Sequence, residues 1–330
     1  MDINEIKYII NEKCKICKTT LEQIVTSVEI PLDFIEKLEK NGIITNERYF
    51  LRLLRALELD PIDLFNKAKL DLKKIKLEND IIYSENKAIQ KMYCGSWLSF
   101  LNYYFDNIFE TLDKDFIWRG HKNSSWKLES TLLREYPEGI DENLINIISD
   151  RFKKSTLGNH ERIEIDKLYS KEELNDNMLW LSLGQHFGLK TPLLDWTNTP
   201  YVASFFAYID KFSETSYRAL YALNRKKFEE LMNQLGEDIK IIDIENHFNK
   251  RLINQQGLFM YGPLEADLES ILEKIEEKQN IPVLYKFLVP NSDRKDILKN
   301  LNKMNINPKS LFPDLIGASI STNIEIELEL

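Results

Sequence analysis

The stretch FIWRGH, residues 116–121, sets an arginine and a glycine into a run of bulky side chains. Its aromatic and β-branched residues are typical of a strand. Glycine after Arg119 leaves room for a ligand to come close to the backbone. An arginine at a strand end presents a planar fork of donors that fits a phosphate or pyrophosphate. The stretch therefore predicts a strand with an anion-binding arginine, and the alternative is a structural ion pair with a carboxylate such as Asp195.

A second segment, LLDWTNTPYVASFFAYI at residues 193–209, reads as a strand that runs into a helix. Thr197 or Thr199 falls at the turn, where a threonine hydroxyl caps a helix and also reaches a ligand near the positive helix end. Three small or aromatic positions of the helix are expected to face the core: Ala203, Phe206 and Ala207.

Residues 93–330 mix strand-like runs with longer helical stretches, which predicts an α+β domain. The strand-like runs are DFIWRG, LLDWT, RALYAL and VLYKFLVP. The expected helices cover residues 97–109, 144–153, 177–187, 200–211 and 264–278. The final IEIELEL alternates acidic and apolar residues, so it reads as a last strand or a solvated tail.

Residues 1–68 read as a small all-α bundle of four or five short amphipathic helices. Three segments make it resemble the Cro-type helix-turn-helix domain of phage repressors and antitoxins: LEQI (21–24), LEKNG (38–42) and LRALEL (54–59). The helix that would enter the major groove, residues 31–40, carries Asp33 and Glu36, which repel DNA phosphates. Two interpretations stay open: operator binding, or a module that forms a homodimer or docks a regulatory protein.

Residues 69–92 are rich in charged residues and contain no glycine or proline. This composition predicts a connecting helix rather than a flexible linker. We therefore expect a helix-turn-helix-like domain at 1–68, a connecting helix at 69–92 and an α+β domain at 93–330.

The composition is that of a folded, acidic protein. Hydrophobic residues make up 43% of the 330 residues, and 44 basic against 53 acidic residues give a net charge of −9. This charge disfavours general attraction to nucleic acids or anionic membranes. The start MDINEIKYII has neither the basic nor the apolar region of a secretion signal, and the apolar runs are too short to span a bilayer. We expect a cytoplasmic protein without a membrane partner.

The common metal and nucleotide signatures are missing from the sequence. Cys14 and Cys17 form a C-x-x-C, but no second ligand pair lies nearby, so no metal site is expected. Neither a G-x-G-x-x-G nor a P-loop motif occurs. The chemistry therefore has to be found in less familiar blocks.

Four blocks in the second domain, taken in order, resemble the FRG domain. This family of bacterial and phage-associated proteins is named for an aromatic-Arg-Gly triplet. The blocks are residues 116–134, 185–207, 251–260 and 311–318. Two positions depart from the family pattern. Trp118 stands where phenylalanine or tyrosine is usual, and Pro192 follows Thr191 where an arginine is common.

The first two blocks also resemble the first two motifs of ADP-ribosyltransferases. The similarity lies in a strand-borne Arg-Gly followed by a strand, a threonine turn and an A-x-x-F-A helix. It implies a split sheet and NAD as the substrate. It assigns catalytic roles to Arg119, His121, Thr197 and Gln256, of which the histidine suits a general base because its ordinary pKa is near neutrality. It assigns NAD binding to Arg119, Gly120, His186, Asp195 and Thr199.

ADP-ribosyl transfer breaks the nicotinamide N-glycosidic bond through an oxocarbenium-like centre, which a nearby carboxylate stabilises. The third motif should therefore carry a glutamate, but NQQGLFM at residues 254–260 offers Gln255 or Gln256. Glutamine hydrogen-bonds a ribose hydroxyl without supplying a charge. Glu265 lies close in sequence, and the identity of the carboxylate stays open.

The sequence thus predicts an NAD-using effector enzyme of a toxin-antitoxin or anti-phage system, with a protein or a nucleic acid as acceptor. Two alternatives remain. A metal-dependent nuclease would assemble carboxylate ligands from Asp195, Asp243, Glu245 and Asp314. A DNA-binding regulator would use the second domain to sense a nucleotide.

Overall fold

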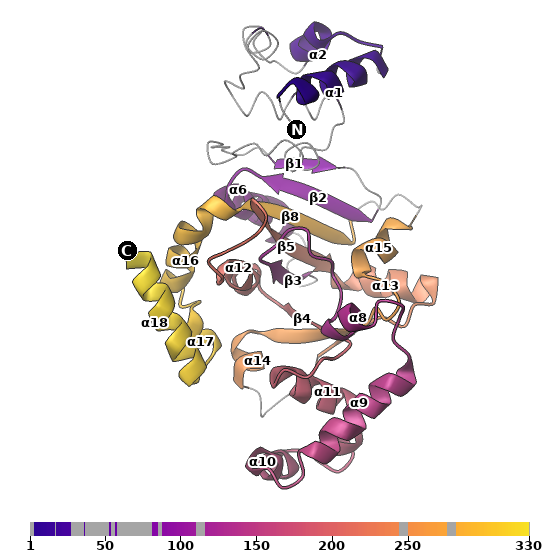
Figure 1. The fold of residues 1–330 in the computed structure, drawn as a ribbon, viewed down its shortest axis with the longest axis vertical. Coiled ribbons are helices and arrows are strands. Elements are labelled where there is room, and N and C mark those ends of the chain that lie inside the picture. The colour runs from indigo at the N-terminus through magenta and orange to yellow at the C-terminus, as the bar shows by residue number, and fades with distance from the viewer. Residues whose placement is uncertain are drawn as a thin grey trace. The chain divides into compact units, whose positions relative to one another are not determined.

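The computed structural model divides the chain into two compact units. Unit 1 comprises Met1–Ser84 with Met92–Asp106, and unit 2 comprises Glu85–Lys91 with Asn107–Leu330. The structure describes residues 3–16, 18–27, 36, 53, 57, 81–84, 88–109, 116–243, 250–275 and 282–329. Figure 1 shows the elements of each unit.

Unit 1 begins with two helices of the expected N-terminal bundle, α1 (Ile3–Ile16) and α2 (Leu21–Ser27). At the start of α2, the Thr20 hydroxyl accepts from the Gln23 amide at 3.2 Å, and the Gln23 side chain accepts from the Thr20 amide at 3.0 Å. This reciprocal pair is a capping box, which fixes where the helix begins. The expected DNA-reading helix at 31–40 lies outside the described residues apart from Glu36, and so do Cys17 and most of the remaining bundle.

The end of the predicted connecting helix is instead two strands, β1 (Ile81–Ser84) and β2 (Ile89–Cys94). Residues 69–80 lie outside the described part of the chain. The strand sequences IIYS and IQKMYC contain isoleucine and tyrosine, which favour a strand where a neighbouring strand is available for pairing. The expected helix at 97–109 is present as α6 (Trp97–Tyr103) and a following π-helix (Tyr104–Phe109).

Unit 2 is an α+β structure, as predicted. Six of its strands form a sheet in the order β8-β5-β3-β4-β7-β6. Their bounds are β3 (Phe116–His121), β4 (Leu193–Thr197), β5 (Tyr217–Asn224), β6 (Lys240–Ile242), β7 (Gly257–Tyr261) and β8 (Leu284–Pro290). The four strands predicted from the sequence are therefore present as β3, β4, β5 and β8.

The sheet is weakly joined in its middle. β3 and β5 are paired at six positions and β4 and β7 at five, whereas β3 and β4 are paired only at Trp118 and Thr197. The sheet therefore consists of two well-paired halves, β8-β5-β3 and β4-β7-β6, which meet at a single position.

Helix α12 (Pro200–Tyr208) packs against β3 at Gly120 (Figure 1). A Cβ atom on Gly120 would lie 1.9 Å from the Ala203 carbonyl oxygen and 2.8 Å from the Ala207 amide nitrogen. The glycine therefore leaves room for the backbone of this helix. This corrects the sequence interpretation, which reserved that space for a ligand.

The C-terminal end of α12 is held by two arginine side chains. The fully buried Arg218 donates to the carbonyl of Ala207 at 2.5 Å and to that of Asp210 at 2.7 Å. Arg294 donates to the carbonyls of Tyr208 and Ile209, each at 2.9 Å. Guanidinium groups at this end satisfy the last carbonyls and offset the negative end of the helix dipole.

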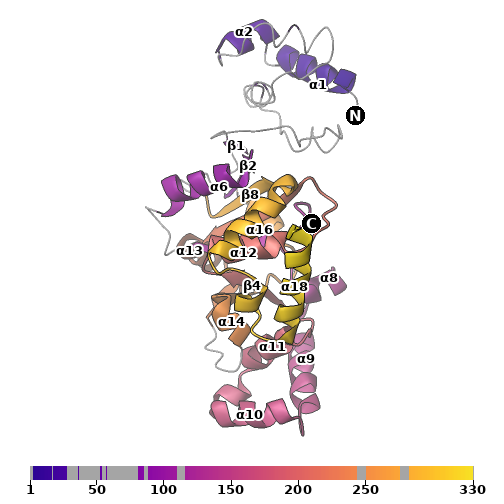
Figure 2. The same ribbon diagram turned by 90° about the vertical axis from the view of Figure 1, so that its left-hand side faces the viewer.

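The remaining helices surround the sheet of unit 2, and α10 lies at the end of this unit remote from β8 (Figures 1 and 2). Their bounds are α8 (Thr131–Glu135), α9 (Glu142–Ser155), α10 (His160–Leu168), α11 (Asn177–His186), α13 (Arg225–Leu235), α14 (Lys250–Asn254), α15 (Leu268–Glu273), α16 (Arg294–Lys303), α17 (Pro308–Leu311) and α18 (Leu315–Glu329). Within the described ranges, no helix is long and apolar enough to cross a membrane.

The described part of the C-terminal IEIELEL, up to Glu329, belongs to α18 rather than to a strand or a solvated tail. Arg294 of α16 makes an ion pair with Glu327, and Lys309 of α17 makes one with Glu325 at 2.8 Å. Ser321 also donates to Glu325 at 2.9 Å, one helical turn away. The Ser321–Glu325 contact uses the i, i+4 spacing of a helix. The two ion pairs hold this helix against α16 and α17.

We predict that Gly120→Ala destabilises the protein by about 3 kcal/mol or more, since the added methyl group overlaps backbone atoms of α12. Urea unfolding of the two proteins measures this loss. The matched control is Gly236→Ala, where no atom lies within 4 Å but φ is +71°, so that only about 1–2 kcal/mol of left-handed strain is expected. Equal losses for the two variants would contradict the close approach of α12.

Candidate functional site

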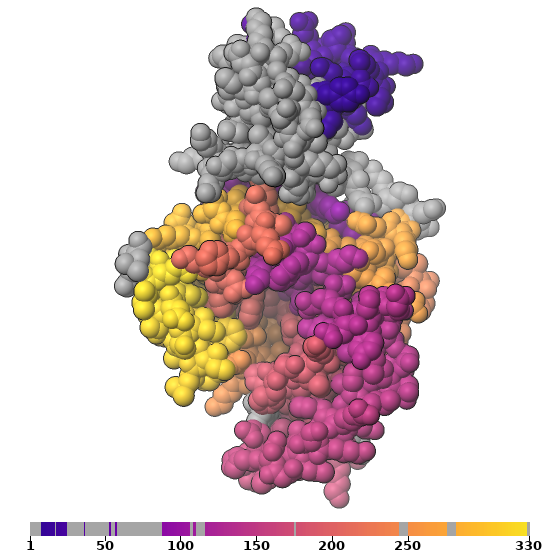
Figure 3. Space-filling view, viewed as in Figure 1, coloured from indigo at the N-terminus to yellow at the C-terminus, as the bar shows by residue number. Residues whose placement is uncertain are grey.

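A pocket of about 630 Å³ lies where the two halves of the sheet meet, because β3 and β4 both line it. It is bordered by residues 122–134 on one side and by Phe312 on another. The space-filling view shows unit 2 hollowed between the magenta segments and the yellow C-terminal helices (Figure 3). Of the predicted site residues, the pocket brings together Arg119, Gly120, His121, His186, Asp195 and Thr197.

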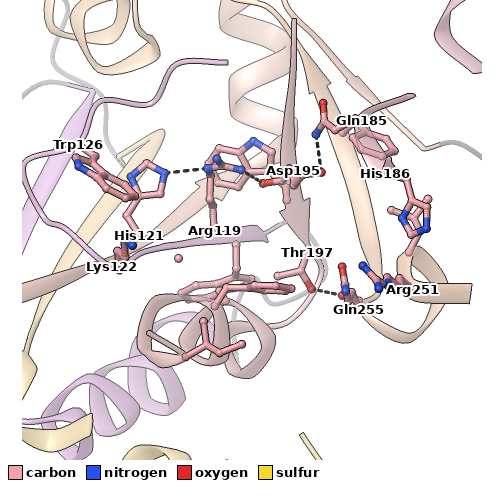
Figure 4. A pocket seen from close by; sticks show the side chains of 18 of the residues that line it. Arg119, His121, Lys122, Trp126, Gln185, His186, Asp195, Thr197, Arg251 and Gln255 are labelled. Carbon is pink, nitrogen blue, oxygen red and sulfur yellow. Dashed lines mark hydrogen bonds between the residues drawn. The ribbon is translucent and has the colours of Figure 1, made fainter. Parts of the chain in front are cut away.

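Arg119 is held in one orientation on the pocket wall (Figure 4). Its Nε donates to Nε2 of His121 at 3.0 Å, and its Nη1 donates to the backbone carbonyl of Asp195. The guanidinium thus bridges β3 and β4 through a main-chain oxygen rather than through the Asp195 carboxylate. Burial lowers the pKa of Arg119, the charge of Asp195 opposes this change, and the charge of Arg134 adds to it.

His121 orients Arg119. Because Nε2 accepts the Arg119 hydrogen bond, the neutral imidazole carries its proton on Nδ1. Burial holds the pKa of His121 well below its usual value, and the charges of Arg119 and Lys286 add to this effect, while the Trp126 backbone opposes it. The expected general-base role does not fit this geometry, since the basic nitrogen is already occupied.

A buried polar row lies beside Arg119 and was missed in the sequence analysis. In the sheet register Arg119 pairs with Tyr221, which pairs with Lys286. Glu269 accepts from the Tyr221 hydroxyl at 3.2 Å and from Lys286 Nζ at 2.9 Å. Burial raises the pKa of Tyr221 well above its ordinary value, and the Glu269 charge raises it further. A tyrosine and a lysine inside the apolar runs RALYAL and VLYKFLVP were the available signal.

Arg134 of α8 is a second guanidinium in the pocket lining, and no role was assigned to it from the sequence. Over the residues that the structure describes, its side chain makes no hydrogen bond and no ion pair. Its charge lowers the pKa of Arg119, so the two cations act on each other inside the pocket. Two guanidinium groups that repel each other are stabilised by an anion that contacts both.

Thr197 and Thr199 use their hydroxyl groups within the fold. Thr197 is 5% exposed, and its hydroxyl donates to the carbonyl of Gln255 at 2.7 Å and accepts from the Thr199 amide at 3.3 Å. The Thr199 hydroxyl caps α12 by accepting from the Tyr201 amide at 3.3 Å. Both residues therefore shape the turn at the pocket edge.

Gln255, rather than the predicted Gln256, lines the pocket. Gln256 has φ of +46°, and this left-handed residue leaves its side chain exposed. Gln255 instead donates from Nε2 to the carbonyl of Leu311 at 3.1 Å. Glu265, the nearby glutamate, is exposed and does not contribute to the pocket lining.

His186 and Arg251 form the opposite side of the pocket (Figure 4). Arg251 Nε donates to Asp314 at 2.7 Å, and its guanidinium lies 5.2 Å from the ring centre of Phe312. Partial burial lowers the pKa of His186, the Arg251 charge adds to this, and the Asp314 charge opposes it. His186 is therefore neutral at pH 7 and suits hydrogen bonding to a ligand rather than charge pairing.

The proposed nuclease ligands engage separate partners. Asp243 pairs with Arg225 at 2.7 Å, Asp314 pairs with Arg251, and the Asp195 carboxylate accepts from the Gln185 amide at 2.7 Å. Glu245 lies outside the described residues. In the described ranges no group of three or more histidine, cysteine, aspartate or glutamate side chains is placed to hold a metal ion.

A known protein family matches the segment that contains β3, β4 and α12, which border this pocket. Residues 114–216 match the FRG domain. The FRG match runs from β3 to α12 and confirms the predicted resemblance over these residues, which are under a third of the chain. It includes Arg119, Arg134, Gln185 and Asp195. No curated protein and no solved structure matched the chain.

We predict that His121 lowers the free energy of unfolding as the pH drops below about 6.5. The unfolded chain takes up a proton there and the folded state does not, which gives a slope of up to about 1.4 kcal/mol per pH unit. Urea unfolding at several pH values between 5 and 8 measures this slope. His121→Gln, which keeps an acceptor for Arg119 but does not titrate, should have the shallower dependence. Parallel curves for the two proteins would contradict the lowered pKa.

Proposed function

We propose that unit 2 is an ADP-ribosyltransferase-like enzyme that binds NAD in the pocket between β3 and β4. The observation that carries this proposal is the pair of guanidinium groups, Arg119 and Arg134, at one pocket. The diphosphate of NAD offers the paired negative charges that such a pair recognises.

The weak joint of the sheet supports the proposal as well. The ADP-ribosyltransferase resemblance implies a split sheet, and β3 and β4 are paired at one position only. A volume of about 630 Å³ lies within the range of about 300–1,000 Å³ that small-molecule sites occupy.

Aromatic side chains at the pocket suit the planar rings of a dinucleotide. Trp126 is 42% exposed and lies beside His121, with ring centres 6.1 Å apart. Lys122 lies 5.4 Å from the centre of the tryptophan ring and pairs with Asp210 at 2.8 Å. Phe312 contributes a second ring on the side of Arg251. Indole and phenyl rings can stack on nicotinamide or adenine without the help of hydrogen-bond donors.

The proposal also assigns a role to the N-terminal helices. We infer that residues 1–68 form a regulatory or assembly module, through a homodimer or a partner protein, and that the whole chain is an effector of a toxin-antitoxin or anti-phage system. The chemical class of the acceptor is a protein or nucleic-acid group. The cytoplasm, where NAD is present, is the compartment that fits this activity.

A nuclease is the less favoured alternative because Asp243 and Asp314 each already pair with an arginine. Magnesium-dependent nicking of a plasmid by the purified protein would favour the nuclease over the transferase.

We predict that the full-length protein binds NAD and releases nicotinamide from it. Arg134→Gln should weaken NAD binding by about 10- to 100-fold, since a charge-assisted hydrogen bond contributes about 1.5–3 kcal/mol. Titration calorimetry measures binding, and chromatography measures the released nicotinamide. Arg134 is the better position to test, because Arg119 also holds His121 and β4 in place.

The matched control is Arg151→Gln, which removes an exposed arginine of α9 that does not line the pocket. Its NAD affinity should equal that of the original protein. Absence of NAD binding by the original protein, or equal affinities for Arg134→Gln and the control, would contradict the proposal.

A further inference from the structure

The carboxylate of Asp195 is held in position by a chain of hydrogen bonds on the pocket wall. Gln185 Nε2 donates to Asp195 Oδ1 at 2.7 Å (Figure 4). The hydroxyl of Thr191 donates to Gln185 Oε1, and it accepts from the backbone amide of Leu193 at 3.2 Å. Thr191 is fully buried, so the chain starts from a fixed point in the fold. The carboxylate itself is exposed to the pocket.

The backbone and the side chain of Asp195 have separate partners. The backbone carbonyl accepts the Arg119 guanidinium, whereas the carboxylate accepts from a neutral amide. Among the described residues no basic group lies within ion-pair distance of this carboxylate. Its negative charge is therefore held beside Arg119 without being neutralised by direct contact.

The other carboxylates of the pocket lack one of these properties. Asp210 is paired with Lys122 at 2.8 Å. Glu129 lines the pocket, but no hydrogen bond to its side chain from another described residue fixes its position. Gln255, in the block where a glutamate was expected, carries no charge and donates to the Leu311 carbonyl. Asp195 alone of these lining residues combines a free charge with a fixed position.

We propose that Asp195 is the catalytic carboxylate, with Gln185 and Thr191 as the residues that position it. This inference rests on the proposed function. When the bond between nicotinamide N1 and ribose C1′ breaks, its electron pair goes to the nicotinamide nitrogen and positive charge develops on the ribose. The Asp195 carboxylate stabilises that charge while neutral nicotinamide leaves. The acceptor then bonds to C1′ and gives up its proton to solvent water.

Arg119 and Asp195 then act on opposite charges of one substrate. The guanidinium contacts the diphosphate, and the carboxylate faces the ribose next to it. Their fixed relation follows from the hydrogen bond between the Arg119 side chain and the Asp195 backbone. A positioned charge costs no reorganisation as the bond breaks, which is the condition for electrostatic catalysis.

The test compares nicotinamide release and NAD affinity for the full-length protein and five variants, one of which is Glu129→Gln. Asp195→Asn keeps the shape and removes the charge, so release should fall by about 100- to 1,000-fold with the dissociation constant changed less than about threefold. Gln185→Leu and Thr191→Val should each lower kcat by about tenfold or more. The dissociation constant for NAD should stay unchanged in both variants. Asp150→Asn, on the exposed face of α9, should behave like the original protein. Thermal melting of every variant checks that the fold is kept.

The outcomes separate this inference from the proposed function. No nicotinamide release by the original protein would overturn both. Release by Asp195→Asn at the original rate would overturn the inference and leave the transferase in place. A loss of release in Glu129→Gln combined with normal release in Asp195→Asn would assign the role to Glu129 instead. A rise in the dissociation constant for Asp195→Asn that accounts for the whole loss would make the residue a binding group and would also overturn the inference.

Discussion

The close approach of α12 to β3 at Gly120 is the constraint on which the site depends. Only a residue without a Cβ lets the backbone of Ala203 and Ala207 reach the strand. The helix is also fixed at its C-terminal end by Arg218 and Arg294, which satisfy its last carbonyls. With α12 on that face of β3, the alternation of the strand turns its neighbouring side chains to the opposite face.

That opposite face is polar because several charges compensate one another there. Arg119 lies in a row with Tyr221 and Lys286, and Glu269 accepts hydrogen bonds from the latter two. Glu269 and Lys286 are thus satisfied within the fold, whereas burial lowers the pKa of Arg119 and the nearby charge of Arg134 adds to that effect. An anionic ligand that contacts both guanidinium groups offsets the repulsion between them. Arg119 therefore has two roles in this account: it links β3 to β4, and it binds the anionic ligand.

Local signals in the sequence were sufficient for the strand at 116–121, because its aromatic and β-branched residues favour a strand, and its pairing with β5 confirms it. The helix predicted at 69–92 was wrong at residues 81–84 and 89–92, where strand pairing outweighed helix propensity. For the third block the sequence prediction named Gln256, whereas Gln255 lines the pocket, because Gln256 takes a left-handed backbone conformation with its side chain exposed. Arg134 was not predictable as a site residue, because its place beside Arg119 depends on tertiary packing that no spacing encodes.

A crystal structure of the full-length protein with ADP-ribose tests the central claim most directly. The account predicts the diphosphate within hydrogen-bonding distance of both Arg119 and Arg134, and the terminal ribose facing the carboxylate of Asp195. A ligand bound away from the joint between β3 and β4, or a diphosphate that contacts neither arginine, would contradict it.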